Sequence, residues 1–574
     1  MVTIRVSCQT TLGAIKRMDG VLVCLSLIFL MVISGVITRF IPSMPTPLIQ
    51  IATGTLLAVS FPSFDVGFNP ELFMLLFIPP LLFNDSWHFP KREFLLYTRP
   101  IVMLSIGLVF FTVGGIGYLV HWLIPLIPLP AAFALAAALS PTDAVSLRSM
   151  TAGAHIPERI MHILQGEALL NDASGLVSFK LAVAAMLTGF FSLKGALLSL
   201  LVMSLGGITV GIVLTYVFIS FLGKLTKHSG HETTTENLLL LLLPFTVYLI
   251  AEKLGFSGVL ATVSAGFTID RAGFLDRTMA KMRIEGHFFW GVLDSTLNGI
   301  IFILLGMYLP HSIKFLEITG YSFSEYIMII VLITVTLILL RTLWLYLTWP
   351  FEALISRRNP SSWRLPNIKI ISTFSLGGVR GAIALAAILS LPHMINGDPF
   401  PARKLLIILV TGVVLCSLLI SSLLLPLITP GLKNLIHKQT QDEENEAMLV
   451  LAKAAVDAIK TKVNSLCEEI NEQERALCIQ VSEKLIASFN QFITSSNGSE
   501  SEKLESILAL TFEVQLRGAA LERAHQELRS LRKQRKINNT TMMKIISRLD
   551  LRQIALHTEH QAISSSLSKK AIST

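Results

Sequence analysis

The chain has 574 residues, of which 52% are hydrophobic and only 15% are charged, and its mean hydropathy is +0.65. This composition excludes an ordinary soluble globular protein and predicts a protein that lies in a lipid bilayer. The net charge of +9 does not indicate nucleic-acid binding, because most lysines and arginines fall in short loops between apolar runs, where they set the orientation of membrane spans.

Apolar runs long enough to cross roughly 30 Å of hydrocarbon number about thirteen, so the predicted fold class is an all-α membrane protein. They follow an N-terminal segment, residues 1–20, and make up a transmembrane domain over residues 21–432. The runs cover residues 21–38, 46–61, 70–87, 100–121, 130–149, 160–189, 194–222, 236–252, 255–270, 288–309, 325–349, 367–392 and 404–429.

The loops between these runs alternate between rich and poor in positive charge. The positive-inside rule makes the rich set cytoplasmic, which places the N-terminus outside and the C-terminus in the cytoplasm. Three basic residues near the start, Arg5, Lys16 and Arg17, disagree with this orientation, and a start of translation at Met18 would remove them. The charge-rich loops hold Arg39; Lys91, Arg92 and Arg99; Arg148 and Arg159; Lys224 and Lys227; Arg271, Arg277, Lys281 and Arg283; and Arg357, Arg358 and Arg364.

Residues 433–574 form a charged tail with few glycines, in which apolar residues recur at helical spacing. We expect a cytosolic helical domain here. A helical hairpin that only aids assembly and a regulatory module are both open interpretations.

Ionisable residues inside the apolar runs are few, and such residues are generally retained for ion pathways, proton relays or charge pairing. The sixth run contains Glu167, Asn171 and Asp172. At 3.6 residues per turn Glu167 and Asn171 share one face of a helix, whereas Ala168 and Asp172 share the adjacent face. Asp172 is therefore expected to face a cavity and bind an ion, while Glu167 forms a structural pair.

Two of the runs contain helix breaks. Pro141 removes an amide donor and frees a carbonyl one turn earlier, next to Thr142, whose hydroxyl is a hard ligand suited to an alkali cation. A second break lies at Ser375-Leu376-Gly377-Gly378-Val379-Arg380-Gly381 in the twelfth run. Two interrupted helices in separate halves of the chain predict inverted repeats, with the substrate site where the breaks meet.

The expected mechanism is direct competition at Asp172. Burial disfavours the charged carboxylate, and either a proton or a bound cation neutralises it, so the two exclude one another. A channel would need a continuous wet pore, and a membrane-tethered sensor would keep the fold without moving ions. An enzyme is the weakest alternative, since no nucleophile and base, metal cluster or phosphate loop stands out, and no cofactor is predicted.

Five ordered blocks resemble the sodium/proton exchangers of the electroneutral branch of the monovalent cation:proton antiporter superfamily, of bacterial type. The resemblance covers residues of roughly 20 to 430 and leaves out the tail. The blocks read ALSPTDAVSL, GEALLNDASGLVSF, AEKLGFSGVLATVSAGF, FWGVLDSTLNGIIFILLGMYL and GGVRGAIALAAILSLP.

The resemblance implies a homodimer in the bacterial plasma membrane, in which a six-helix core domain with two crossed broken helices moves against a dimerisation domain. It also implies electroneutral 1:1 exchange, because Asn171 stands where the electrogenic branch usually has a second aspartate. The ion would be Na⁺, bound at Asp172, Thr142 and Asp143, with K⁺ or Rb⁺ as the alternative and Li⁺ as a further substrate. The family's residue pairs fall on Asn171–Asp172, Thr142–Asp143 and the buried ion pair Glu167–Arg380.

The chain also departs from the family pattern. Ala168 replaces a serine whose hydroxyl would reach the ion, so ion choice cannot be copied from relatives that have the serine. The acidic residue that orients the asparagine is replaced by Asn84, followed by Asp85, and either is a candidate partner for Asn171. Ser140, beside the first break, completes the expected supporting layer, and Ala144 stands where the family usually has proline.

Overall fold

The structure is a computed structural model of the chain. The N-terminal segment 1–20 and the alternative start at Met18 lie outside the residues it describes. Those are residues 23–556 except 24, 43, 62–69, 152–155, 189–192, 230–231, 275–279, 317–322, 356–367, 393, 396–397, 401, 430–438, 468–471, 498–499, 535, 537–540, 543–544, 547 and 554–555.

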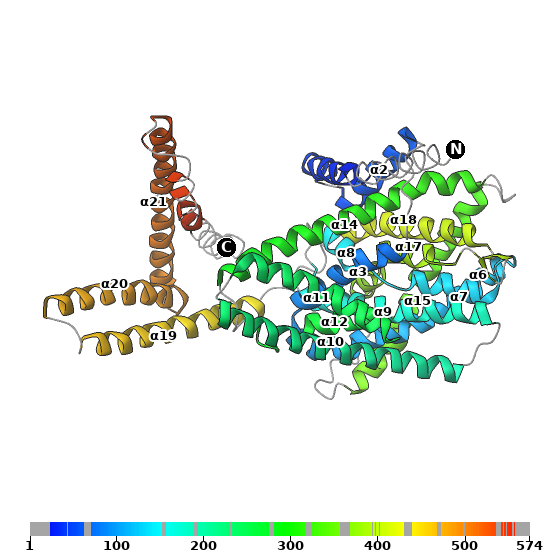
Figure 1. Ribbon diagram of the computed structural model, residues 1–574, viewed down its shortest axis with the longest axis horizontal. Coiled ribbons are helices and arrows are strands. Elements are labelled where there is room, and N and C mark those ends of the chain that lie inside the picture. The colour runs from blue at the N-terminus through cyan, green and yellow to red at the C-terminus, as the bar shows by residue number, and fades with distance from the viewer. Residues whose placement is uncertain are drawn as a thin grey trace, which may run out of the picture. The chain divides into compact units, whose positions relative to one another are not determined.

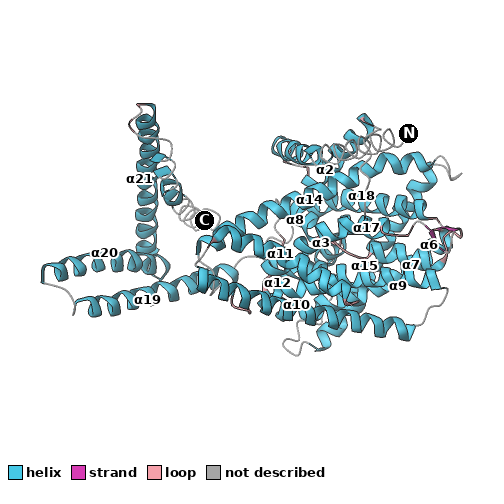
Figure 2. Cartoon of the chain, in the orientation of Figure 1, coloured by secondary structure: helices cyan, strands magenta, loops and turns pink. Residues whose placement is uncertain are grey.

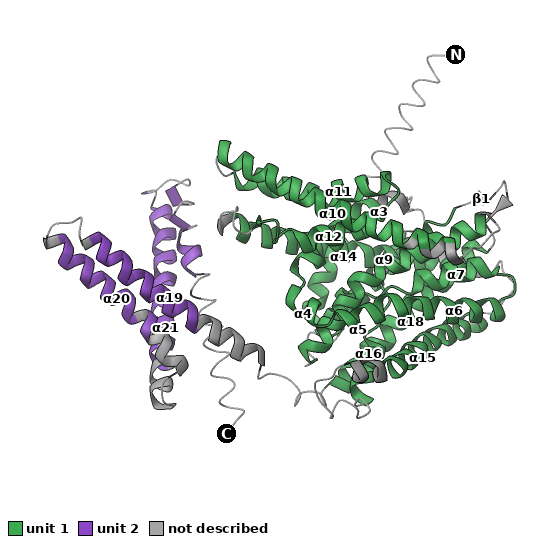
Figure 3. Ribbon diagram, turned by 90° about the horizontal axis from the view of Figure 1, so that it is seen from below, with its two compact units in different colours: residues 1–436 green, residues 437–574 purple. Residues whose placement is uncertain are grey.

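The chain divides into two compact units, residues 1–436 and residues 437–574 (Figure 3). Helices dominate the described part of both units (Figure 2). Strands occur only as a two-residue antiparallel pair within that part, β1 (Met394–Ile395) and β2 (Asp398–Pro399), in which Met394 lies opposite Pro399. The prediction of an all-α protein is therefore confirmed at the level of fold class.

The helices of the first unit pack side by side as a bundle (Figure 1). Their bounds are α2 (Thr46–Ser60), α3 (Pro70–His88), α4 (Lys91–Leu96), α5 (Thr98–Val102), the π-helix η1 (Met103–Gly107), α6 (Leu108–Leu123), α7 (Leu129–Leu139), α8 (Ala144–Thr151), α9 (Glu158–Thr188), α10 (Leu193–Ser229), α11 (Thr233–Lys253), α12 (Gly258–Thr268), α14 (Ala280–Leu316), α15 (Phe323–Ile355), α16 (Ile368–Leu376), α17 (Ala382–Leu389) and α18 (Arg403–Ile428).

Seven helices in the described residues are long and apolar enough to cross a membrane, or eight if the bent pair α7 and α8 counts as one span. Shorter apolar helices cover Leu25–Phe40, Thr46–Ser60 and Gly258–Thr268. The chain is thus a multi-pass membrane protein. The number of about thirteen spans and the inverted repeat stay predictions.

The break between α7 and α8 follows from its sequence. Pro141 has no amide hydrogen with which to continue the helical hydrogen bonds, and it lies between the end of α7 at Leu139 and the start of α8 at Ala144, which are bent by 45°. The corresponding break between α16 and α17 spans residues 377–381, of which three are glycines.

The core of the first unit is centred on α7. Eight residues of this helix are at most 1% exposed, including Ala131, Leu135 and Leu139, and they pack with buried side chains of α17 and α18. These side chains are covered by neighbouring helices and not exposed at the surface of the bundle. The break at Pro141 therefore lies in the interior of the bundle.

The second unit contains three long helices, α19 (Gln439–Cys467), α20 (Glu472–Asn497) and α21 (Glu500–Lys533). His525 on α21 has an acceptor at each ring nitrogen: the Leu521 carbonyl lies 2.9 Å from Nδ1, and an Asp550 carboxylate oxygen lies 3.0 Å from Nε2. Only a protonated imidazole donates from both nitrogens. The hydrogen bond to Asp550 accordingly raises the pKa of His525 above its ordinary value of 6.5.

The contact between His525 and Asp550 is therefore expected to depend on pH. Because the folded pKa is raised, the stabilisation is complete below about pH 6.5 and is lost as the pH rises through the raised pKa. A ring-carbon NMR titration of His525 in the full chain measures this pKa. Asp550→Asn should move it back toward 6.5, and an unchanged titration would contradict the assignment.

Candidate functional site

The two helix breaks meet in the interior of the bundle, as the sequence predicts. The amide of Asp143, at the first break, donates a hydrogen bond of 2.8 Å to the carbonyl of Val379, at the second. Gly381 is needed for this approach, since a Cβ atom there would lie 2.6 Å from the Cβ of Asp143. The two interruptions thus form one crossing.

Asp172 lies next to this crossing with an unsatisfied oxygen. Its side chain is 5% exposed, and no described residue donates a hydrogen bond to its buried Oδ1 atom. It lines a cavity of about 70 Å³ together with Thr142, Asp143 and Ala168. A buried carboxylate oxygen without a donor is costly unless a proton or a cation occupies it, so this cavity is the candidate ion site.

Asn171 points at the first break. Its side-chain amide donates to the Thr142 hydroxyl at 2.7 Å, and its oxygen accepts from the Thr142 backbone amide at 3.3 Å. Neither Asn84 nor Asp85 is the partner that the sequence suggested: Asp85 lines the cavity, and the side chain of Asn84 forms a hydrogen bond with Asp294. Asn171 therefore fixes the segment between α7 and α8 beside Asp172.

Asp143, predicted as a cation ligand, caps α8 in the structure. One carboxylate oxygen accepts from the backbone amides of Val145 at 2.9 Å and Ser146 at 3.2 Å, and the other accepts from the Ser146 hydroxyl at 2.5 Å. This satisfies donors that would otherwise be orphaned at the start of the helix. Asp143 still lines the cavity, but its oxygens are already engaged.

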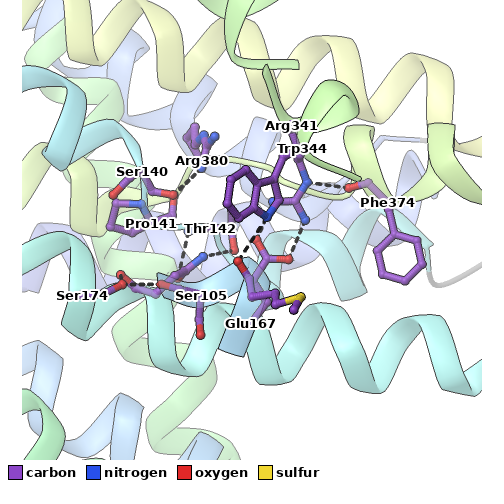
Figure 4. Close-up of polar contacts among 12 residues, drawn as sticks. Ser105, Ser140, Pro141, Thr142, Glu167, Ser174, Arg341, Trp344, Phe374 and Arg380 are labelled. Carbon is purple, nitrogen blue, oxygen red and sulfur yellow. Dashed lines mark hydrogen bonds and ion pairs between the residues drawn. The ribbon is translucent and has the colours of Figure 1, made fainter. Parts of the chain in front are cut away.

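The buried ion pair differs from the predicted one. Glu167 pairs with Arg341 of α15 and not with Arg380: both side chains are 1% exposed, and Arg341 Nη2 lies 2.6 Å from Oε2 while Nη1 contacts Oε1. Arg341 Nε donates to the Phe374 carbonyl at 2.7 Å, which completes the fork (Figure 4). The planar guanidinium matches the carboxylate in two parallel bonds, and α9 is thereby joined to α15 and α16.

Arg380 has a different role at the first break. Its Nη1 atom donates to the carbonyls of Ser140 at 2.5 Å and Pro141 at 3.2 Å (Figure 4). These carbonyls lack helical partners because Pro141 interrupts α7, and a buried cation at the C-terminal end of a helix is favoured by the helix dipole. Arg380, which the sequence predicted as the partner of Glu167, therefore donates its hydrogen bonds to carbonyls at the break after α7.

Several polar residues at the cavity, and an ion pair outside it, were not identified from the sequence. Gln165 and Asn298, which both carry a side-chain amide, line the cavity. Lys180 of α9 pairs with Glu252 of α11. Gln165 could have been found, because it lies one helical repeat from Asp172 on the same stripe of α9. The other pairings cross between helices and have no local signal.

The arrangement suits an alkali cation and a proton more than a transition metal. In the part of the chain that the structure describes, no three His, Cys, Asp or Glu side chains converge as a metal site. The cavity offers instead one unsatisfied carboxylate with nearby hydroxyl, amide and carbonyl oxygens, which are hard ligands.

Comparison with known proteins agrees with this chemistry. A protein of Escherichia coli K12, named as an uncharacterized Na⁺/H⁺ exchanger, YjcE, is 41% identical over 539 residues, which is 92% of this chain and 97% of that protein. An antiporter of Bacillus subtilis 168, named for sodium, potassium, lithium and rubidium against H⁺, is 40% identical over 481 residues, 83% of this chain and 69% of that protein.

The fold has a solved counterpart. The sodium proton antiporter MjNhaP1 of Methanocaldococcus jannaschii superposes with a TM-score of 0.53 at 18% identity, covering 70% of this chain and 97% of that one. The family model described as the sodium/hydrogen exchanger, transmembrane, matches residues 25–430. The chain therefore belongs to the sodium/hydrogen exchanger family, and it is a membrane transporter of monovalent cations and protons rather than an enzyme.

Proposed function

We propose that the chain exchanges one monovalent metal cation for one proton at Asp172. The observation that carries this proposal is the buried Oδ1 atom of Asp172, which faces the cavity and has no donor among the described residues. Binding of a proton or of a cation would satisfy that oxygen and neutralise the carboxylate. Only one of the two can bind at a time. Competition at one carboxylate is sufficient to couple the two fluxes.

The charge balance supports electroneutral 1:1 exchange. Glu167 is compensated by Arg341, Asp143 is capped by three donors, and Asn171 carries no charge. Asp85 also lines the cavity and is proposed to keep one charge state, so that Asp172 is the group whose charge changes in the cycle. The loaded site is neutral with either ion and can move within the bilayer interior, whereas the empty, charged site moves reluctantly.

Na⁺ is the first candidate cation, with K⁺ or Rb⁺ as the alternative and Li⁺ as a further substrate. Thr142 and Asp143 are proposed to complete the site with Asp172, and Asp85 and Ser140 to support it. Ala168 supplies no oxygen to the cavity, while Gln165 and Asn298 lie further along its lining. Such a sparse site fits the four cations in the name of the Bacillus subtilis relative.

The cellular setting is proposed from the loop charges and from the family. The protein would work as a homodimer in a bacterial plasma membrane, with its N-terminus outside and its C-terminal helical tail, residues 433–574, in the cytoplasm. A role in pH and sodium homeostasis follows from that location.

Proton flux in everted vesicles tests this function. Na⁺, Li⁺, K⁺ and Rb⁺ are added separately after a proton gradient has been established, and each transported cation should dissipate the gradient. A dissipation independent of membrane potential supports 1:1 exchange. Failure of all four cations would overturn the proposal, and faster exchange with K⁺ than with Na⁺ would overturn the first choice of ion.

Ala168→Ser is expected to alter the apparent affinity for the cation more than the maximal rate. The new hydroxyl would lie one helical turn from Asp172 and add a hard oxygen to the cavity. The measurement is the half-saturating cation concentration in the vesicle assay, with an expected fall of about threefold to tenfold for Na⁺. Ala173→Ser, on the same helix but off the cavity lining, is the control, and an equal change in both variants would contradict the prediction.

A further inference from the structure

The surroundings of Asp172 differ toward the two ends of α9. Toward the N-terminal end of α9 the cavity is lined by half-buried Gln165 and Asn298 and by exposed Arg148. Toward the other end, one to two turns beyond Asp172, Leu176, Val177 and Phe179 are only 6%, 3% and 4% exposed. An apolar layer thus separates Asp172 from the far side of the bundle.

An ion pair lies beyond this apolar layer. Lys180 follows Asp172 on α9 by about 12 Å at 1.5 Å per residue. Its Nζ atom donates to both oxygens of Glu252, at the end of α11, over 3.1 and 3.0 Å. Glu252 also accepts from the backbone amide of Gly258 at 3.2 Å, which fixes the carboxylate at the start of α12.

The pair joins two separately packed groups of helices. α9 packs mainly against α7, α5 and η1, whereas α11 and α12 pack against each other and against α10 and α3. The second group is tightly packed: a Cβ atom on Gly207 of α10 would lie 2.5 Å from the Ser257 carbonyl before α12. The contacts of α9 with α3 and α12 are far fewer, so Lys180–Glu252 is a polar connection across the weaker boundary.

A separate cavity lies beside the pair. A second cavity of about 60 Å³ is lined by Lys180 and Glu252, by Tyr248 and Ser257, and by the same Leu176, Val177 and Phe179 that cover Asp172. On α9 the first cavity is lined by residues between 165 and 172 and the second by residues between 176 and 180, so these apolar side chains lie between Asp172 and Lys180 along the helix. Movement of α9 relative to α11 and α12 would join the two cavities, but only after Lys180 leaves Glu252.

We propose that Lys180 and Glu252 form a gate that keeps Asp172 closed to their side of the membrane and that opens when the carboxylate is exposed there. This inference rests on the proposed exchange at Asp172. The two side chains are 48% and 32% exposed, and a partly exposed ion pair is weak enough to break in every transport cycle. Its neutralisation shifts the population toward the conformation that is open on the Lys180 side.

Cysteine accessibility tests the gate without relying on transport. Leu176→Cys, in a full-length chain whose five native cysteines are replaced, is treated with a membrane-impermeant maleimide from the Lys180 side. Glu252→Gln should raise the labelling rate about fivefold or more, because the pair no longer opposes opening. The charge swap K180E/E252K should return the rate to that of the native pair.

Two further measurements test whether the change in labelling comes from loss of the Lys180–Glu252 pair. Gln165→Cys, labelled from the opposite side, should react more slowly when Glu252 is neutralised. Lys253→Gln removes the neighbouring exposed charge and should change neither rate. If Leu176→Cys does not fold, Val177→Cys occupies the same layer.

Unchanged labelling in Glu252→Gln, or an equal rise in Lys253→Gln, would overturn the gate. The proposed function is judged separately: cation-driven proton flux that persists in Asp172→Asn would overturn the exchange mechanism whatever the labelling shows. A functional exchanger with unaltered labelling in Glu252→Gln would overturn the gate alone.

Discussion

Asp172→Asn should reduce cation-driven proton flux to the rate of vesicles that lack the protein. The amide has nearly the same size as the carboxylate, but it neither binds a proton in this pH range nor offers a negative charge to a cation. Both substrates thus lose the same group. The measurement is gradient dissipation by Na⁺, Li⁺, K⁺ and Rb⁺ at matched protein content.

A binding assay separates lost chemistry from lost structure. Cation binding to the native protein should raise its Tm in detergent, because a ligand that binds only the folded state stabilises it. Asp172→Asn should keep the Tm of the cation-free protein and lose the cation-dependent rise. Asp457→Asn makes the same chemical change on the exposed side of α19 and should alter neither quantity. Native flux in Asp172→Asn would refute the mechanism.

Glu167→Gln should be among the most destabilising single changes in the membrane domain. It leaves the guanidinium of Arg341, 1% exposed, without its anionic partner, and breaking a buried pair in this way costs about 3–5 kcal/mol. A clear fall in Tm is expected, with reduced yield of folded protein. Transport would then be lost for a structural reason.

A double-mutant cycle identifies the partner of Glu167. Glu167→Gln and Arg341→Gln should be strongly non-additive in their effects on Tm, because each removes the same pair. Glu167→Gln with Arg380→Gln should be closer to additive, since Arg380 donates to the Ser140 and Pro141 carbonyls instead. Coupling to Arg380 that exceeded the coupling to Arg341 would contradict the observed pairing.

Local sequence signals predicted the helix breaks well. Pro141 and the glycines around Val379 each carry a backbone restriction that acts within one or two residues, so the interruptions could be located without the fold. Their meeting followed from the expectation of a site between them, and the hydrogen bond from Asp143 to Val379 agrees with it.

Partners across helices could not be predicted in the same way. Arg341 and Arg380 are both buried arginines in late spans, and nothing in their spacing tells which one reaches Glu167. The choice depends on the carbonyls that Pro141 exposes, which hold Arg380 at the break. The capping role of Asp143 was accessible, because an aspartate just before a helix is a recognised start signal.

The hydrogen bond between Asp143 and Val379 ties the two broken helices backbone to backbone at the crossing beside Asp172. We expect this link to persist when the site opens to either face of the membrane. A cation bound there would then meet the same oxygens on both faces and have a similar intrinsic affinity on each. The two ion gradients set the net direction of any such exchanger. Similar affinities would add that it saturates at similar cation concentrations in both directions.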